Sequence, residues 1–371
     1  MGSGLLEREL ARFDPERPLE EAHTPPSSWY TEPELYRLEA RAVFASSWHA
    51  VARADQLREP GDFVTTSIAG NPVFAVCGVD GEVRAFHNVC RHHAAELLEG
   101  EGRESRIVCP YHGWAYGLDG RLERAPGLGG IKNLDRSELD LAPLALERFG
   151  PFYFASAGSP ESLAASLAAL DARLTELGWS DLEFVGRRRY TIACNWKVIV
   201  DNYLDGGYHV ARLHPDLAGR LELDSYRTEV FPAYITQTSD AASRGSGADL
   251  AERIGQGALY AWLWPGFMVN RYGPMLDTNC VVPRGVECTE LIYDFFAEPE
   301  RSRDREFVER CMDASDRVQR EDTRICESVQ RGLGSPGFDR GRYAARFEAG
   351  AHAFHRRLAA ELQASAGAPI P

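Results

Sequence analysis

The sequence predicts an α+β protein made of a small β-rich region followed by a larger region that combines an antiparallel sheet with helices. Short strand-like runs fill residues 48–157, and longer ones follow one another within residues 222–297. Helical patterns at residues 163–177 and 307–329 flank the second group. Strands that do not alternate with helices pair antiparallel, with helices to one side. With 371 residues, 44% of them apolar, the chain is long enough for two hydrophobic cores.

The first 45 residues predict an arm and a short helix that pack on the larger domain. Residues 1–30 are charged and contain four prolines, which is typical of extended chain. The next apolar residues predict the helix; they are Leu35, Leu38, Val43 and Phe44. The predicted domains are therefore residues 1–45, 46–157 and 158–371.

Hairpin signals identify the small β domain. The strand-like runs 73–76 and 83–86 are joined by Asp80-Gly81, a dipeptide typical of tight hairpin turns. Asp119-Gly120 repeats the signal. We therefore expect a compact antiparallel β domain.

The larger domain opens with an amphipathic helix. Ser159 is a candidate N-cap before Pro160, and a stripe of five leucines from Leu163 to Leu177 stops at Gly178. Residues 239–257 are rich in serine, glycine and alanine and predict a mobile loop, which is a candidate lid. The predicted strands are 222–236, 258–271, 277–283 and 288–297.

Charge and cysteine usage restrict the functional class. The formal net charge is −14, which disfavours nucleic acid and anionic membranes and mildly favours a cationic ligand or basic redox partner, although solubility explains it equally well. No apolar run approaches the roughly 20 residues of a membrane span, and no signal peptide is evident, so we expect a cytoplasmic protein. Eight cysteines are too sparse for a disulfide scaffold.

The segment 195–214 carries the first candidate metal site. It contains His209 and His214 together with Asp201 and Asp205, one of which is expected to hold a ligand imidazole. Two histidines and a carboxylate form the facial triad of non-haem Fe(II) oxygenases. The alternative is that both histidines serve packing only.

Asp322 is the candidate for the distant carboxylate. The predicted helix 307–329 has an apolar stripe, and Asp322 lies on it, four residues after Val318 and four before Cys326. A carboxylate that faces the core is costly unless it is paired or bound to metal. The alternative is a buried salt bridge with Arg320 or Arg324. The stripe is Val308, Cys311, Met312, Val318, Ile325, Cys326 and Val329.

The most specific motif is Cys90-x-His92, then sixteen residues, then Cys109-x-x-His112. Two thiolates and two imidazoles suit a Rieske-type [2Fe–2S] cluster, which passes single electrons onward. Tetrahedral zinc is the competing interpretation. His93, next to His92, is interpreted as a bystander.

From about residue 30 to 364 the chain resembles the α-subunits of Rieske non-haem iron oxygenases. The resemblance rests on the two Cys/His motifs, on Cys109 to Tyr116 and on Asn195 to His214. Within the family it is most similar to choline monooxygenases, plant enzymes of glycine betaine synthesis. The similar stretches are residues 201–210, 270–274, 277–279, 315–319 and 326–333. His93 departs from the arginine that the family usually has.

The resemblance implies an all-β Rieske domain and a helix-grip (START-like) catalytic domain with a curved antiparallel sheet. It implies that His209, His214 and Asp322 bind mononuclear Fe(II), and that Asn202 helps to order the iron's surroundings. It also implies a homotrimer. In the trimer an electron from the cluster of one subunit would reach His209 of the next through Asp205.

Aromatic residues predict the substrate class. Tyr260, Trp262 and Trp264 alternate along a predicted strand and so share one face of the sheet. Together with further aromatics they are candidates for a cage around a quaternary ammonium group, although an aromatic core is equally compatible. The further candidates are Phe267, Tyr272, Tyr293 and Phe295.

The expected reaction is the hydroxylation of choline to betaine aldehyde hydrate with O2. Electrons would come from a separate NAD(P)H-dependent reductase or ferredoxin, because no G-x-G-x-x-G run in the chain follows a predicted strand, as a dinucleotide fingerprint requires. An alternative is an oxygenase that demethylates or cleaves glycine betaine, carnitine or proline betaine, with Arg271 as a candidate for binding the carboxylate. An alternative of a different class is a Rieske electron carrier or a zinc-stabilised binding protein.

Overall fold

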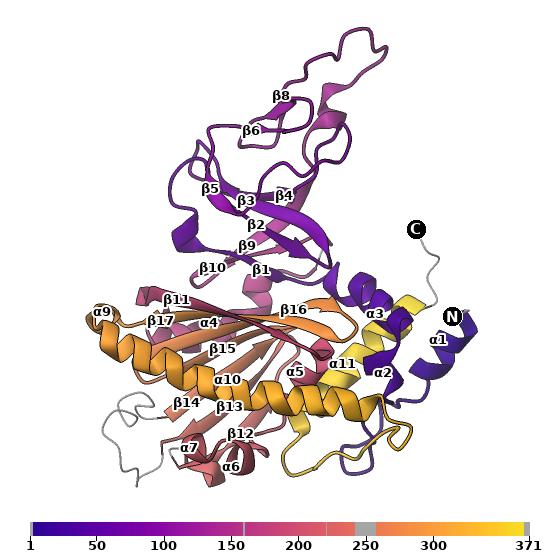
Figure 1. Cartoon of the computed structure of the whole chain (residues 1–371), viewed down its shortest axis with the longest axis vertical. Coiled ribbons are helices and arrows are strands. Elements are labelled where there is room, and N and C mark those ends of the chain that lie inside the picture. The colour runs from indigo at the N-terminus through magenta and orange to yellow at the C-terminus, as the bar shows by residue number, and fades with distance from the viewer. Residues whose placement is uncertain (1–2, 159, 220, 242–256, 367–371) are drawn as a thin grey trace. The chain divides into compact units, whose positions relative to one another are not determined.

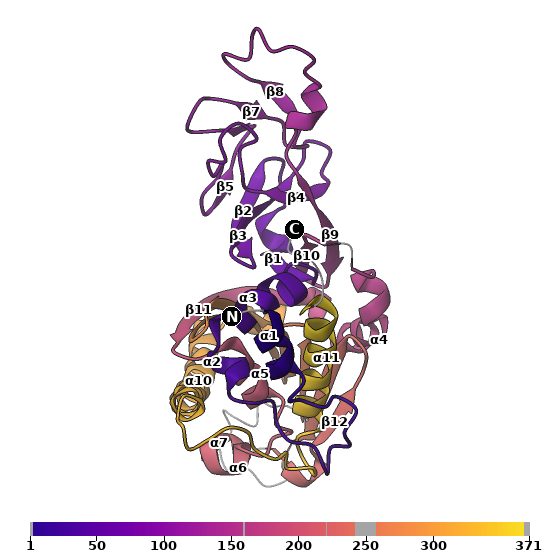
Figure 2. The same ribbon diagram turned by 90° about the vertical axis from the view of Figure 1, so that its right-hand side faces the viewer.

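The computed structural model describes residues 3–158, 160–219, 221–241 and 257–366 and confirms the α+β class. The chain forms two compact units (Figures 1 and 2). The small unit is Phe44–Ala172, and the large unit joins Met1–Val43 to Arg173–Pro371. The division at residue 172 falls within helix α4 (Leu163–Glu176). The boundaries predicted after residues 45 and 157 stay predictions.

The small unit is built on two antiparallel sheets. Its larger sheet has seven strands in the order β1-β10-β9-β4-β3-β2-β5, and its smaller sheet has the order β6-β7-β8. Both predicted hairpins are present, because β3 pairs with β4 around Gly81 and β7 pairs with β8 around Gly120. The strands are β1 His49–Arg53, β2 Asp62–Ile68, β3 Asn71–Cys77, β4 Val83–His87, β5 Glu101–Arg103, β6 Ile107–Val108, β7 Ala115–Tyr116, β8 Leu122–Arg124, β9 Pro143–Phe149 and β10 Phe152–Ser156.

The large unit is a curled antiparallel sheet with helices packed on it (Figure 1). The strand order is β11-β17-β16-β15-β14-β13-β12, so β13 to β17 pair in sequence order. Helix α10 (Arg305–Leu333) lies across the sheet and contacts β11, and α11 (Ala349–Ala366) contacts β12. The strands are β11 Glu183–Ile192, β12 Arg227–Val230, β13 Tyr234–Asp240, β14 Gly257–Leu263, β15 Phe267–Tyr272, β16 Met275–Gly285 and β17 Cys288–Ala297.

The prediction from the sequence missed one strand and joined pairs of others into single runs. The strand β11 escaped prediction because it carries consecutive arginines; Arg187 and Arg189 are neutralised across the sheet by Asp294 and Glu290 of β17. The predicted run 258–271 is two strands, β14 and β15, and the run 222–236 covers β12 and part of β13. Of the predicted loop 239–257, residues 242–256 lie outside the described part of the chain.

The helices differ from prediction mainly at their ends. The N-terminal arm contains α1 (Ser3–Leu10) and α2 (Ser28–Thr31), and the predicted short helix is α3 (Pro33–Glu39), which is continued by a π-helical turn. In α10 the predicted stripe was wrong at Ile325 and Val329, which are 39% and 44% exposed. The four leucines of α4 are buried, whereas Leu177, the residue after the helix, is 40% exposed. The predicted cap Ser159 lies outside the described residues.

Candidate active site

Helix α5 (Trp196–Tyr203) positions the first part of the site. The Asn195 side chain caps it by accepting a hydrogen bond from the backbone N–H of Lys197 at 3.1 Å. The buried Lys197 ammonium lies 2.5 Å from a carboxylate oxygen of Glu39, the last residue of helix α3. Trp196 donates a hydrogen bond to the same carboxylate. Burial lowers the pKa of Lys197. This buried pair fixes α5 against the N-terminal segment.

The turn after α5 brings Asp205 under His209. Gly206 and Gly207 have φ values of +71° and +74°, which favour glycine, and a Cβ at Gly206 would collide with the backbone oxygen of Phe347. The Asp205 carboxylate accepts hydrogen bonds from His209 Nδ1 at 2.6 Å and from the backbone N–H groups of Gly207 and His209, each at 3.0 Å. The carboxylate therefore fixes the ring with its Nε2 turned away.

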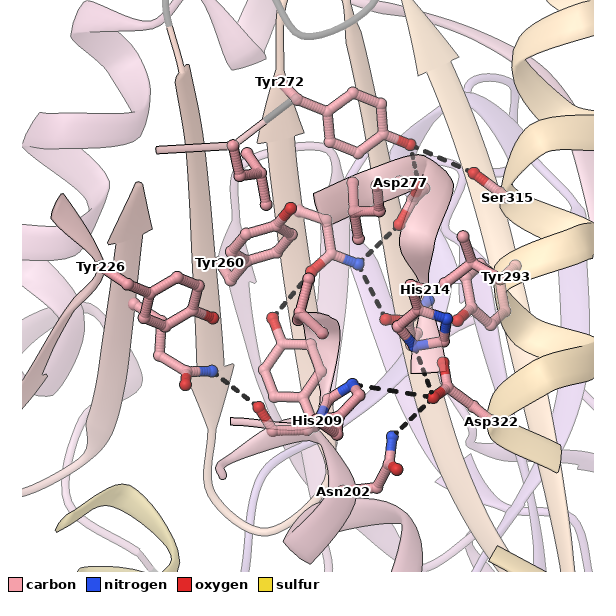
Figure 3. A pocket seen from close by; sticks show the side chains of 18 residues that line it. Asn202, His209, His214, Tyr226, Tyr260, Tyr272, Asp277, Tyr293, Ser315 and Asp322 are labelled. Atoms are coloured by element: carbon pink, nitrogen blue, oxygen red, sulfur yellow. Dashed lines mark hydrogen bonds and ion pairs between the residues drawn. The ribbon is translucent and has the colours of Figure 1, made fainter. Parts of the chain in front are cut away.

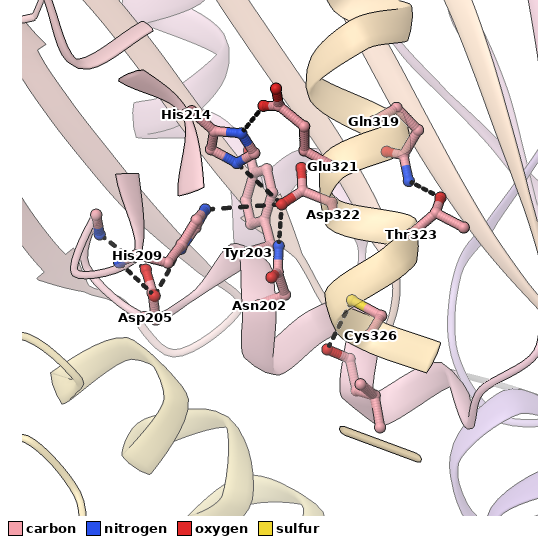
Figure 4. Close-up of polar contacts among 12 residues, drawn as sticks. Asn202, Tyr203, Asp205, His209, His214, Gln319, Glu321, Asp322, Thr323 and Cys326 are labelled. Carbon is pink, nitrogen blue, oxygen red and sulfur yellow. Dashed lines mark hydrogen bonds and ion pairs between the residues drawn. The ribbon is translucent and has the colours of Figure 1, made fainter. Parts of the chain in front are cut away.

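His209, His214 and Asp322 converge at one point (Figure 4). Their ligand-capable atoms all lie within 4.8 Å of one another. His214 Nε2 is 3.0 Å and His209 Nε2 is 3.8 Å from Asp322 Oδ1. Asn202 Nδ2 donates to the same oxygen at 3.0 Å. Two imidazole nitrogens and one carboxylate at this spacing fit a facial-triad metal site.

Glu321 is a further site residue that the sequence analysis missed. His214 Nδ1 lies 2.6 Å from its carboxylate. Burial alone lowers the pKa of His214, but the hydrogen bonds with Asp322 and Glu321 outweigh burial and raise it. The sequence feature that could have revealed Glu321 is the adjacent pair Glu321-Asp322, because two successive carboxylates on a helix can reach the two nitrogens of one imidazole ring. The proposed salt bridge to Arg320 is not formed, since Arg320 pairs with Asp316 at 2.7 Å.

Asp201 does not hold a histidine of this cluster. Helix α5 ends at Tyr203, so Asp201 lies on the helix whereas Asp205 lies in the turn after it. The Asp201 carboxylate instead accepts a hydrogen bond from Tyr30 at 2.7 Å and lies 3.0 Å from His355 Nε2. Asp201 therefore ties α5 to α2 and α11.

Replacing Glu321 by glutamine is expected to weaken Fe(II) binding by about 10-fold without preventing folding. The amide keeps the shape but is a poorer acceptor for His214 Nδ1–H, and such outer partners typically contribute 10- to 100-fold to metal affinity. Titration of iron-free protein with Fe(II) measures this. Glu327→Gln removes a charge from the same helix and should bind iron normally; equal affinities for both variants would contradict the role of Glu321.

A cavity of about 150 Å³ is lined in part by His209, His214 and Asp322 (Figure 3). Five tyrosines line it, of which the sequence analysis proposed three. Burial raises the pKa of Tyr203, Tyr226 and Tyr293 well above that of free tyrosine, so their hydroxyls stay protonated. The tyrosines are Tyr203, Tyr226, Tyr260, Tyr272 and Tyr293. Tyr203 and Tyr226 lie at the ends of short helices, where strand alternation gives no signal.

The other four proposed aromatics do not line the cavity. Trp262 shares the face of Tyr260, but α11 covers that end of the sheet, and the Trp262 ring packs 5.5 Å from Phe354. Trp264 packs on the same helix, with Arg357 4.3 Å from its ring centroid. Phe267 lies on the opposite face by strand alternation. Phe295 is fully buried and stacks against Tyr293.

Polar side chains from β15 and β16 form the far wall of the cavity. Asn270 Nδ2 donates to Asp277 at 2.6 Å and to Asn279 at 2.8 Å, and its carbonyl accepts from Tyr203 at 2.7 Å. Asn279 Nδ2 is buried with no hydrogen-bond partner among the described residues. The described lining includes no lysine or arginine. Arg271 turns to the opposite face, where it binds the backbone oxygen of Leu177 and the Glu298 carboxylate.

The Cys/His motifs form two loops in the small unit. Cys90 and Cys109 are buried in its core, whereas His92 and His112 are exposed with ring centroids 4.6 Å apart. Trp114 stacks on His92. Burial raises the pKa of Cys90, but hydrogen bonds from Tyr116 and from backbone N–H groups outweigh burial and lower it. Buried sulfurs beside exposed imidazoles fit a Rieske cluster.

Comparisons with known proteins agree with this geometry. Residues 47–135 match the family model of the Rieske [2Fe-2S] domain, and residues 179–364 match that of the ring hydroxylating alpha subunit catalytic domain. The chain is a Rieske non-haem iron oxygenase. Its cofactors are the [2Fe–2S] cluster and a mononuclear iron, and its co-substrate is O2. The zinc-binding and electron-carrier alternatives do not fit a chain with both domains.

Several relatives of this Rieske oxygenase act on quaternary ammonium compounds. Chloroplastic choline monooxygenase of Arabidopsis thaliana is 45% identical over 93% of this chain and 84% of its own length. The carnitine monooxygenase oxygenase subunit of Escherichia coli is 33% identical over 86% of each chain. A solved quaternary ammonium Rieske monooxygenase, studied for carnitine oxidation by gut microbiota, superposes with a TM-score of 0.84 at 28% identity over 96% of this chain and 98% of that one. No helix in the described ranges has the length and apolar character to cross a membrane.

Proposed function

We propose that this oxygenase hydroxylates choline at the carbon that bears its hydroxyl group, giving betaine aldehyde hydrate. The reaction consumes choline, O2, two electrons and two protons and releases water. The observation that carries the proposal is the tyrosine-lined cavity beside His209, His214 and Asp322. Tyrosine faces attract a quaternary ammonium cation, which has no N–H to donate. The higher identity to choline than to carnitine monooxygenases supports the choice.

The proposed ligands follow from the two residue clusters. His209, His214 and Asp322 would hold the ferrous ion, and the cluster would be held by Cys90, His92, Cys109 and His112. When bound, the cluster supplies single electrons and the ferrous ion activates O2. The chain itself orients these groups. Asn202 holds the Asp322 carboxylate, and the tyrosines keep the reacting C–H bond near the three converging ligands.

We propose that Asp205 bridges the two centres across a subunit boundary in a homotrimer. Its carboxylate already holds His209 Nδ1, and His112 is exposed on its own domain and thus available to a neighbouring copy. Electrons would come from a separate NAD(P)H-dependent reductase or ferredoxin. We place the enzyme in the cytoplasm, in glycine betaine synthesis.

The proposal is tested with a panel of trimethylammonium compounds. Protein loaded with both metal centres is given an electron donor and O2 with choline, glycine betaine, carnitine or proline betaine, and products are identified by mass. We expect choline to gain one oxygen with the highest kcat/KM. The carboxylated compounds should react poorly, because no described lining residue is basic apart from the two histidines and Arg271 faces away. Oxidation of carnitine without choline would refute the choline assignment.

A further inference from the structure

Gln237 is a buried side chain that binds the backbone on both sides of Asp205. It lies in β13, is 1% exposed and lines the active-site cavity. Its Nε2 donates a hydrogen bond to the backbone oxygen of Tyr203 at 2.7 Å, and its Oε1 accepts one from the backbone N–H of Gly206 at 3.2 Å. Both polar atoms of the amide are therefore bound to the turn that follows α5.

The turn itself lies between α5, which ends at Tyr203, and α6 (Val210–Leu213). Side-chain hydrogen bonds therefore contribute much of what fixes its shape. Asp205 lies between the two backbone groups that Gln237 binds, and its carboxylate holds His209 Nδ1 at 2.6 Å. A buried N–H or carbonyl oxygen that loses its partner is costly. Gln237 thus favours the one conformation of the turn that brings Asp205 to His209.

A second residue of the cavity wall packs on the same turn. A Cβ at Gly207 would lie 2.9 Å from the ring of Tyr226, so this ring lies directly against the turn. Tyr226 lines the cavity, as Gln237 does. The backbone at Phe347 also approaches the turn, because a Cβ at Gly206 would collide with it. The turn has little room to move while Gln237 holds it.

We propose that Gln237 is a positioning residue for electron entry. By holding the backbone on either side of Asp205, it sets the orientation of that carboxylate and, through it, of His209. The role rests on the proposed function, in which Asp205 passes electrons to His209. The amide is already bound to the backbone at both ends, so we expect it to act on electron transfer rather than on affinity for the substrate.

The test compares two routes to the same product in Gln237→Met, which keeps an unbranched side chain of similar length but neither hydrogen bond. With an electron donor and O2, electrons must pass through Asp205. With hydrogen peroxide, choline gives betaine aldehyde hydrate and water, and no electron has to pass between centres. A small misplacement at a reacting site is costly, so the donor-driven rate should fall at least about 10-fold.

The second route and the KM separate positioning from other roles. In Gln237→Met the peroxide-driven rate and the KM for choline should change by less than about 3-fold, because the ferrous site and the substrate contacts remain. Equal losses by both routes would show a structural role and overturn the proposal. A raised KM with an unchanged kcat would show a substrate contact and would overturn it as well.

Gln330→Met is the matched control. Gln330 is 4% exposed and also joins backbone groups through its amide, at the start of α5. Its Oε1 accepts from the Asn195 N–H at 2.9 Å, and its Nε2 donates to the Tyr30 oxygen at 3.4 Å. Gln330 is not among the residues that line the cavity. The ratio of the donor-driven to the peroxide-driven rate should therefore stay at the wild-type value. A ratio that falls as far as in Gln237→Met would contradict the proposal.

Gln237→Glu is a second variant, which serves if Gln237→Met does not fold. It keeps an acceptor for the Gly206 N–H and loses only the donor to the Tyr203 oxygen. Its donor-driven rate should fall while its peroxide-driven rate holds. A wild-type ratio in this variant would count against Gln237 as a positioning residue.

Hydrogen exchange distinguishes failure of this role from failure of the choline assignment. If the wild-type enzyme does not oxidise choline, the proposed function fails, whereas exchange still tests Gln237 in the metal-loaded enzyme without substrate. The Gly206 N–H should exchange at least about 10-fold faster in Gln237→Met than in the wild type, because it has lost its acceptor. The Asn195 N–H should exchange at the wild-type rate. Equal exchange of Gly206 in both proteins would refute the role of Gln237 whatever the true substrate is.

Discussion

Replacing Asp205 by alanine is expected to lower O2-dependent product formation at least about 100-fold while both metal centres stay loaded. Asp205 is not one of the three converging ligands. Losing the partner of His209 Nδ1 should weaken Fe(II) binding, as for Glu321, so the variant is loaded with excess Fe(II) before the assay. The change removes the carboxylate that accepts from His209 Nδ1 at 2.6 Å and from two backbone N–H groups. The His209 ring then loses its orientation and the proposed bridge between centres is broken.

Three measurements test the role of Asp205. Iron analysis and the visible spectrum of the cluster should match those of the wild-type enzyme. Rapid mixing of the reduced variant with choline and O2 should show a cluster that no longer reoxidises together with product formation. Hydrogen peroxide carries both the oxygen and the two electrons, so it should restore product formation without transfer between centres. Normal coupled turnover would refute the bridge.

Replacing Asp322 by alanine is expected to remove the mononuclear iron and all oxygenase activity. The three ligand-capable groups lie within 4.8 Å, and Asp322 is the only anionic member of the set. Without it two neutral imidazoles remain, which do not balance the charge of Fe(II). The iron content should fall from about three atoms per chain to about two, because the cluster alone contributes two.

Asp313→Asn is the matched control for Asp322. Asp313 lies on the same helix, is exposed and pairs with Arg188 at 3.3 Å. This variant should keep the full iron content and full activity. Asp322→Ala should keep the visible spectrum of the cluster and lose only the third iron. Retention of that iron in Asp322→Ala would refute the proposed ligand set.

Local chemistry was predictable from the sequence where one short segment determines it. The Cys90-to-His112 motifs specify their site because each pair lies on one tight loop. Asp322 was predicted from a helical stripe, and the structure places it beside His214 on α10, an uninterrupted helix of 29 residues. The Asp80-Gly81 hairpin likewise depends only on its own turn.

The features that the sequence did not reveal depend on what covers each surface. Strand alternation placed Tyr260 and Trp262 on one face, but it does not tell which part of that face is left open and which part α11 covers. The sequence analysis missed the strand β11 because the acidic partners of its arginines come from a strand about 100 residues later. The role of Glu321 became evident only once His214 was placed beside it.

The ion pair between Lys197 and Glu39 has a consequence for biosynthesis. Glu39 precedes the Rieske domain in the chain and Lys197 follows it, so the oxygenase core is discontinuous and the Rieske domain is an insertion within it. During translation the inserted domain is complete when residue 172 emerges, whereas residues 1–43 must wait for the sheet, α10 and α11. The N-terminal segment is thus among the first to be synthesised and among the last to find its place.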